Sequence, residues 1–155
     1  MLPRALFRLA LRLVVQPYFR LTRGQTLGVR AAVRDPSGGF LLVRHTYAPG
    51  WMFPGGGVDR SETLEDAVVR EVWEETGVRA LDRPRLVSVF ANFDRFKGDH
   101  IALYLIDTWR QEDKTSLEIA EWGFYAPDSL PADTTGGTRR RIAEITNAGS
   151  SAVEW

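Results

Sequence analysis

The stretch AVVREVWEETG, residues 67–77, contains mostly good helix formers, has no proline, and ends in Gly77, where a helix commonly stops. The pattern predicts a helix over residues 64–76. On a helical wheel of about 100° per residue, its apolar residues form one stripe. Glu71 and Glu75 fall inside that stripe. An unpaired buried carboxylate is costly, so these two side chains require a partner.

A divalent cation would supply that partner. Glu74 lies at the edge of the stripe. The three carboxylates thus occur at i, i+3 and i+4, where Cβ atoms are roughly 5–6 Å apart, and they repel each other. Oxygen ligands of this kind suit Mg²⁺, with Mn²⁺ as the alternative ion. The competing interpretation is a solvated acidic face on which Arg70 pairs with Glu74.

The residues on either side of this helix complete a motif. From Gly56 to Val78 the sequence reads GGVDRSETLEDAVVREVWEETGV, directly after the loop segment FPG. It resembles the Nudix box, G-x5-E-x7-R-E-U-x-E-E-x-G-U, in which U is a bulky aliphatic residue. Every fixed position matches: Gly56, Glu62, Arg70, Glu71, Glu74, Glu75 and Gly77, with Val72 and Val78 at the aliphatic places.

The resemblance implies an α+β fold, the Nudix-type α/β/α sandwich with a mixed β-sheet. It also implies Mg²⁺-dependent hydrolysis of a nucleoside diphosphate linked to another group, by attack of water on phosphorus. The alternatives are hydrolysis of a non-nucleotide pyrophosphate and a non-catalytic, ligand-sensing module. A small-molecule diphosphate, and no nucleic acid, is the expected partner.

The family also implies roles for the residues of the box. The metal ligands would be Glu71, Glu74, Glu75 and the carbonyl of Gly56. Glu71 or a metal-bound hydroxide would act as the base. Arg70 would orient the glutamates, and Glu62 would pair with Arg70 or hold a metal-bound water.

Residues outside the box complete the predicted site. The segment SLEIAEWGFY offers Glu118 and Glu121 as a further metal ligand or base. Arg44 could grip a phosphate at the end of a strand. Trp51 and Phe53 could stack on a base, although aromatic residues also cover sheet edges.

Other segments of the chain predict the remaining elements. Residues 26–34 and 40–44 indicate a strand hairpin across the turn DPSGG. Further strands are expected at residues 85–93, 100–109 and 121–126, and a final helix at residues 138–147.

Composition limits the partners and the compartment. The 155 residues carry a formal net charge of zero, which gives no support for attraction to nucleic acid. The chain has no cysteine, which fits a cytoplasmic location. Residues 1–22 predict an amphipathic helix ahead of one domain over residues 23–155. That helix would pack on the domain or form a homodimer, with contact to a membrane surface as the alternative.

Overall fold

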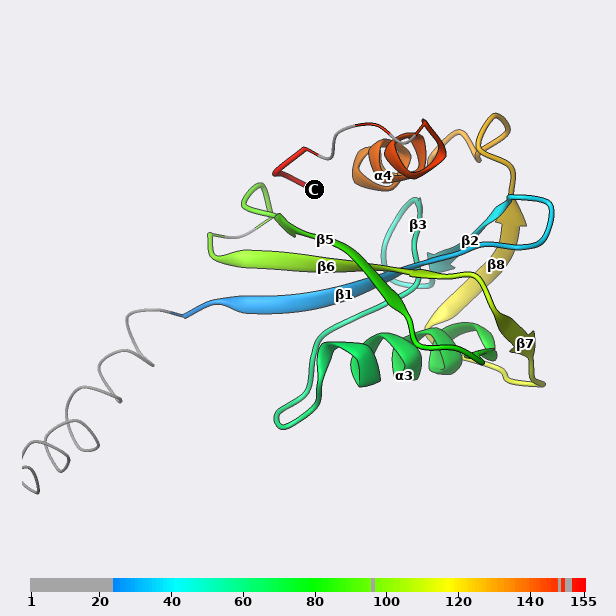
Figure 1. Cartoon of the computed structure of the whole chain (residues 1–155), viewed down its shortest axis with the longest axis horizontal. Helices are drawn as coiled ribbons and strands as arrows, with labels where there is room; N and C mark the ends of the chain where they lie inside the picture. Colours follow the sequence, from blue (N-terminus) through cyan, green and yellow to red (C-terminus); the bar gives the residue numbers. More distant parts are fainter. Residues whose placement is uncertain (1–23, 96, 148, 150–151) are drawn as a thin grey trace, which may run out of the picture.

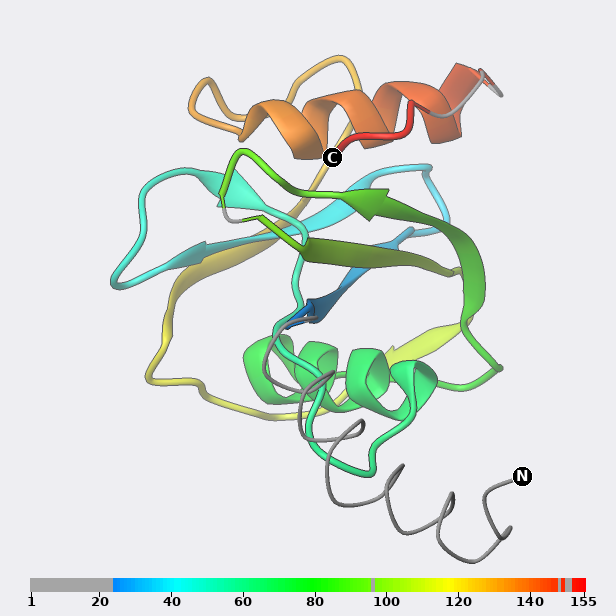
Figure 2. The same cartoon turned by 90° about the vertical axis from the view of Figure 1, so that its left-hand side faces the viewer.

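The structure, a computed structural model, describes residues 24–95, 97–147, 149 and 152–155. The helix predicted within residues 1–22 lies outside these ranges. Helices α3 (Leu64–Thr76) and α4 (Gly136–Asn147) lie on opposite sides of the strands, which gives three layers (Figures 1 and 2). Neither of these helices is long and apolar enough to cross a membrane.

The strands form three small sheets, in the orders β1-β6-β5, β3-β2-β8 and β4-β7. Their pairing is mixed: β1 is parallel to β6, and the other pairs are antiparallel. The bounds are β1 Thr26–Val33, β2 Phe40–His45, β3 Trp51–Met52, β4 Val78–Ala80, β5 Arg85–Ala91, β6 Asp99–Ile106, β7 Trp109–Gln111 and β8 Ile119–Tyr125.

The predicted hairpin of residues 26–34 and 40–44 is wrong in its pairing, although both strands and the turn are present. Asp35 accepts hydrogen bonds from the backbone of Ser37 and Gly39, which closes the turn. The strands then separate after an isolated bridge between Arg34 and Phe40. Strand β1 instead pairs with β6 over its full length. A tight turn fixes the local reversal of the chain, whereas the partner of each strand depends on distant residues.

Strand β1 is buried on both faces, and its side chains alternate between two cores. Val29, Ala31 and Val33 pack with residues of α3. Ala32 packs on the other side, with Ile142 of α4. Both faces of this strand therefore pack in a core, and a polar side chain on it needs a hydrogen-bond partner or access to a cavity.

Helix α3 has the bounds and caps that the sequence predicted. The side chain of Thr63 accepts a hydrogen bond from the backbone of Asp66, and Gly77 ends the helix with φ 73°. Val68 and Val72 are buried against the sheet, and each contributes about 1.5–3 kcal/mol. These contacts fix the rotation of the helix about its axis, and so determine which glutamates point inward.

Candidate active site

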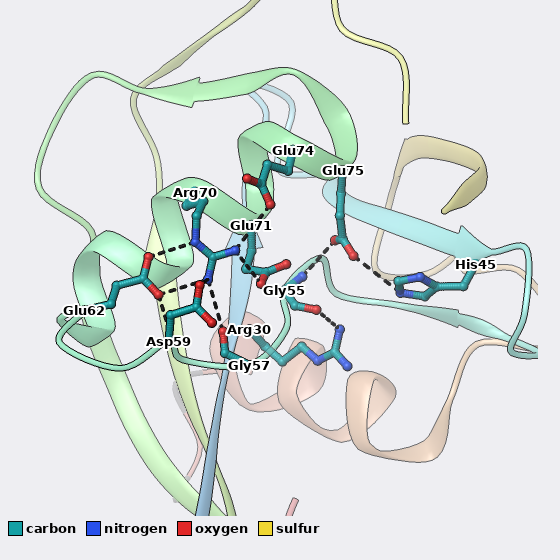
Figure 3. Close-up of polar contacts among 10 residues, drawn as sticks. All are labelled: Arg30, His45, Gly55, Gly57, Asp59, Glu62, Arg70, Glu71, Glu74 and Glu75. Atoms are coloured by element: carbon teal, nitrogen blue, oxygen red, sulfur yellow. Dashed lines mark hydrogen bonds and ion pairs between the residues drawn. The ribbon is translucent and has the colours of Figure 1, made fainter. Parts of the chain in front are cut away.

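Glu75 is the most enclosed carboxylate of the site. Its side chain is 7% exposed. Oε2 accepts a hydrogen bond of 2.9 Å from the backbone N–H of Gly55, and Oε1 lies 3.6 Å from Nε2 of His45 (Figure 3). Burial raises the pKa of Glu75 to about 7, against the lowering effects of the Gly55 hydrogen bond and the Arg30 charge. Without a cation, this carboxyl group is therefore about half protonated near pH 7.

Glu71 and Glu74 lie one turn of helix and one residue before Glu75, respectively. The side chain of Glu71 is 17% exposed, and burial raises its pKa. The side chain of Glu74 is 48% exposed, as its place at the edge of the helical stripe predicted. Of these three carboxylates, those of Glu71 and Glu75 are thus the least exposed to solvent.

Arg70 lies at the centre of a cluster of carboxylates beside these residues (Figure 3). Its Nε and Nη2 donate to the two oxygens of Glu62, at 2.8 and 2.9 Å. Its Nη1 donates to Glu71 at 2.8 Å and to Glu74 at 3.2 Å. The hydrogen bonds from Arg70 are the largest cause that lowers the pKa of Glu62 to about 2. The guanidinium therefore holds Glu62 charged and fixes one oxygen of Glu71.

The loop of Gly55, Gly56 and Gly57, called the glycine loop below, lies beside these carboxylates. At Gly56 a Cβ atom would come within 2.6 Å of the Glu71 carboxylate, so the missing side chain makes room for that group. The carbonyl of Gly56 accepts a 2.9 Å hydrogen bond from the N–H of Val29. This hydrogen bond uses one lone pair of the carbonyl oxygen and leaves the other for a further contact, so the use of Gly56 as a metal ligand stays a prediction. Gly55 has φ 140°, and a Cβ there would lie 2.1 Å from the Val29 carbonyl oxygen.

Two cavities adjoin at this loop. The larger has a volume of about 510 Å³, and Gly55, Gly56 and Gly57 form part of its wall. The smaller has a volume of about 260 Å³ and is lined by Glu71, Glu74, Glu75 and residues 114–118. Because Gly55 lines the first cavity and bonds a carboxylate that lines the second, a ligand that spans both must pass this contact.

The chain matches a known protein family. Residues 24–144 match the model of the NUDIX domain, and this range contains α3, the loop of Gly55–Gly57 and every described strand and helix except the end of α4. The chain belongs to the Nudix family. It is a Nudix hydrolase, a pyrophosphohydrolase enzyme.

Relatives agree with the family match. A Bacillus subtilis protein, provisionally named an 8-oxo-dGTP diphosphatase, is 30% identical over 79% of this chain and 80% of its own length. A MutT-like protein of Streptomyces ambofaciens is 37% identical over 68% of this chain and 66% of its own. The crystal structure of a MutT NUDIX hydrolase from Burkholderia pseudomallei has a TM-score of 0.69 and 31% identity, over 79% of this chain and 98% of that one. The α+β Nudix fold is thereby confirmed.

The donor set of the smaller cavity fits a divalent cation in its chemistry. Its wall carries the carboxylates of Glu71, Glu74, Glu75 and Glu118, and hard oxygen ligands of this kind suit Mg²⁺ or Mn²⁺. Burial raises the pKa of two of them, so a nearby positive charge would favour their ionised form. Within the described residues, no three acidic or histidine side chains are already arranged around one point.

Of the two acidic residues predicted outside the box, only Glu118 lies in this cavity. Glu121 pairs instead with Arg44 across strands β8 and β2, at 2.7 Å. Neither Glu121 nor Arg44 lines either cavity. Their predicted roles as base and phosphate contact are therefore not supported by their positions, because each neutralises the other on the sheet surface.

The two aromatic residues predicted to stack on a substrate are core residues. Phe53 is 0% exposed and packs edge-on against Phe40. Trp51 is 7% exposed and packs edge-on against Tyr125. The prediction of substrate contact is wrong for both, because the loop that carries them turns these rings inward and leaves Tyr47 exposed.

Three residues of the site were missed in the sequence. Arg30 of β1, His45 of β2 and Arg95 all line the larger cavity. Burial lowers the pKa of His45, so its ring is neutral at neutral pH. Only Arg30 left a signal: it is a charged residue within the otherwise apolar strand segment GVRAAV.

Proposed function

We propose that this Nudix hydrolase cleaves the diphosphate of a nucleoside diphosphate linked to another group, with Mg²⁺ as its cofactor. The observation that carries the proposal is the pair Glu71 and Glu75, two poorly solvated carboxylates at the junction of two cavities. A hydrolase of diphosphates needs a cation at such a point, since both the site and the substrate are negatively charged. The relative named for 8-oxo-dGTP supports a nucleotide as the substrate.

The two cavities suggest how a nucleotide would lie. The larger one has apolar and aromatic lining, from Leu27, Tyr47, Ile101 and Trp155, which suits a base and sugar. The smaller one holds the carboxylates. The diphosphate would then cross the glycine loop beside Gly55, so that one phosphorus atom lies over Glu71 and Glu75.

Each side chain has a defined task in the reaction. Glu71, Glu74, Glu75 and Glu118 would hold Mg²⁺, and the bound ion would supply positive charge that neutralises the diphosphate and makes water more acidic. Oε1 of Glu71 is held by Arg70, which leaves Oε2 to accept the proton of the attacking water. The water oxygen forms the new bond to phosphorus, and the bridging P–O bond breaks toward the leaving phosphate.

Non-nucleotide pyrophosphates are the competing substrates, and a ligand-sensing module without catalysis is the competing class. The second is disfavoured because a binding module has no need for four carboxylates on one cavity wall. A cytoplasmic location fits the absence of cysteine.

The test is a phosphate-release panel with Mg²⁺. It includes nucleoside triphosphates with and without an oxidised base, nucleoside diphosphate sugars, dinucleoside polyphosphates and a non-nucleotide organic diphosphate. Wild type is compared with Glu75→Gln and with Glu65→Gln, a matched change on the same helix at a residue that pairs with Arg83. We expect turnover of a nucleotide by wild type and Glu65→Gln but not by Glu75→Gln. No turnover by any protein, or equal turnover by all three, would contradict the proposal.

A further inference from the structure

Arg30 holds the glycine loop from the side. Its Nη1 donates hydrogen bonds to the carbonyl oxygens of Phe53 and Gly55, at 2.9 and 2.8 Å. One nitrogen thus fixes two peptide groups that are two residues apart. The same Gly55 residue donates its N–H to Glu75, so Arg30 is one residue removed from the buried carboxylate of the site.

The neighbouring backbone completes the attachment. The N–H groups of Val29 and Ala31 donate to the carbonyls of Gly56 and Pro54, both at 2.9 Å. The four consecutive carbonyls of residues 53–56 are therefore all bonded by residues 29–31. Two of these carbonyls accept hydrogen bonds from the backbone of β1, and the other two accept them from the side chain of Arg30. Loss of the Arg30 side chain would leave two carbonyls of the loop without their partners.

The guanidinium of Arg30 is only partly used by this contact. Its Nε and Nη2 have no hydrogen-bond partner in the described part of the chain, and the residue lines the larger cavity. Figure 3 shows the free end of the group pointing away from the loop. A guanidinium has five N–H donors, and donors left unused at a cavity wall can bind an acceptor that carries negative charge.

Arg141 shows what an arginine with a structural role looks like in this fold. It is 0% exposed, and its guanidinium donates to Glu144 and to the carbonyl of Glu154. It also stacks on the ring of Phe90 at 4.2 Å. Its charge is paired within the protein, whereas Arg30 forms no ion pair with a described residue.

The rest of the larger cavity has the same electrostatic character. Arg95 lines it too. Burial is the main cause that lowers the pKa of Arg30; the charge of Glu75 opposes this effect, and the charge of Arg95 adds to it. The described lining has one carboxylate, Asp99, and both of its oxygens accept hydrogen bonds, from Thr26 at 2.5 Å and Asn92 at 2.6 Å. Arg30 and Arg95 therefore face this cavity without a direct ion pair to a carboxylate of the described residues, although Arg30 feels the charge of Glu75 from a distance.

We propose that Arg30 is a positioning residue that couples the two cavities. Its Nη1 orients the Gly55 peptide toward Glu75, and its free donors, together with Arg95, bind a phosphate or other anionic group of the substrate in the larger cavity. The identity of that group as part of the substrate rests on the proposed function. The substrate class is thereby narrowed to compounds that carry an anionic group beyond the phosphorus atom placed over the carboxylates.

The positioning role is tested by hydrogen exchange, without metal and without turnover. Amide exchange of Gly55 is measured by NMR in wild type, Arg30→Gln and Arg34→Gln. Arg34 follows the same strand and pairs with Asp107 on the surface, so it is the matched control. We expect exchange at Gly55 to be at least about tenfold faster in Arg30→Gln, because the loop loses two hydrogen bonds, and unchanged in Arg34→Gln. Equal exchange in all three proteins would overturn this role.

The binding role is tested with inorganic pyrophosphate as the probe. Calorimetry is done on protein stripped of divalent ions with a chelating resin. We expect the Kd to rise about tenfold or more in Arg30→Gln and less in Arg95→Gln, since charge-assisted hydrogen bonds are lost. Arg34→Gln should bind like wild type. An unchanged Kd in a folded Arg30→Gln protein would overturn the role.

Arg30→Lys carries both tests if Arg30→Gln does not fold. The lysine ammonium group keeps the charge but lacks the planar set of donors that bonds two loop carbonyls and an anion at once. We therefore expect the Kd for pyrophosphate to rise about fivefold. A Kd equal to that of wild type would count against the proposal. A protein that shows both effects but hydrolyses nothing in the substrate panel would support this inference and contradict the proposed function.

Discussion

Glu62 and Glu75 are two glutamates of the same motif in opposite electrostatic settings. Glu62 accepts two hydrogen bonds from Arg70, and its pKa is lowered to about 2. Glu75 is buried beside a neutral histidine and a backbone N–H, and its pKa is raised to about 7. The chain thus pairs Glu62 directly with a guanidinium, whereas Glu75 has only the more distant charge of Arg30, which does not offset its burial. A buried carboxylate without an ion pair is characteristic of a binding site, whereas a carboxylate paired with an arginine is characteristic of a structural contact.

The largest test of this contrast is Glu75→Gln. We expect kcat to fall at least about 1,000-fold, as when an electrostatic contact to the transition state is lost. At pH 8 without metal, the same change should increase the free energy of unfolding, because a buried charge is removed. Steady-state kinetics and urea unfolding measure the two effects. A variant that is both inactive and less stable under these conditions would mean that Glu75 has a structural role.

The second test is the pH dependence of stability in metal-free protein. Glu75 has a raised pKa in the folded state. Its contribution to the free energy of unfolding is therefore fully present below its ordinary pKa of 4.5 and is lost as pH rises through about 7. The shift corresponds to about 3 kcal/mol. The lowered pKa of His45 acts in the opposite direction, with stability lost as pH falls. Urea unfolding at pH 5 to 8 should therefore show a loss in wild type that is absent from Glu75→Gln.

Mg²⁺ provides the control for this pH experiment. A cation that binds the carboxylates should remove most of the loss at pH 8, because it favours the ionised form of Glu75. If saturating Mg²⁺ leaves the pH dependence unchanged, the carboxylates do not hold the ion.

The third test changes the space above the carboxylates and leaves their charges intact. In Gly56→Ala, the new methyl group would lie 2.6 Å from the Glu71 carboxylate. That carboxylate is the end of a side chain but is held by Arg70, so its displacement should cost about 1–3 kcal/mol in stability. We expect kcat to fall about 10- to 100-fold, since a displaced catalytic group acts poorly. A large loss of stability with normal kcat would contradict this expectation.

The smallest effect is expected when the partner of Glu62 is changed. Arg70→Lys keeps the charge beside Glu62 but loses the planar contact to both of its oxygens. The Arg70 side chain is 28% exposed, so solvent screens the pair and the cost in stability should be at most about 1 kcal/mol. The kcat should fall about tenfold, because Glu71 loses its partner. Thermal unfolding and kinetics measure both changes, and a greater effect on stability than on kcat would invert the comparison.

Much of the site could be predicted from residues 56–78. Helix α3 begins and ends where the sequence indicated, with the predicted caps. The inward direction of Glu71 and Glu75 and the rim position of Glu74 followed from helical periodicity. The predictions for Trp51 and Phe53, whose rings are buried, and for Arg44 and Glu121, which line neither cavity, concern residues of strands, loops and sheet surfaces. There, local pattern does not determine which face is covered.

The sequence by itself determined the carboxylate helix, because its spacing, caps and apolar stripe are properties of one continuous segment. The tertiary structure alone decided that β1 pairs with β6 and not with β2, and that Arg30 meets a loop 23 and 25 residues further along the chain. Those contacts depend on which distant strands and loops pack together, and the free energy of that choice is spread over the whole core.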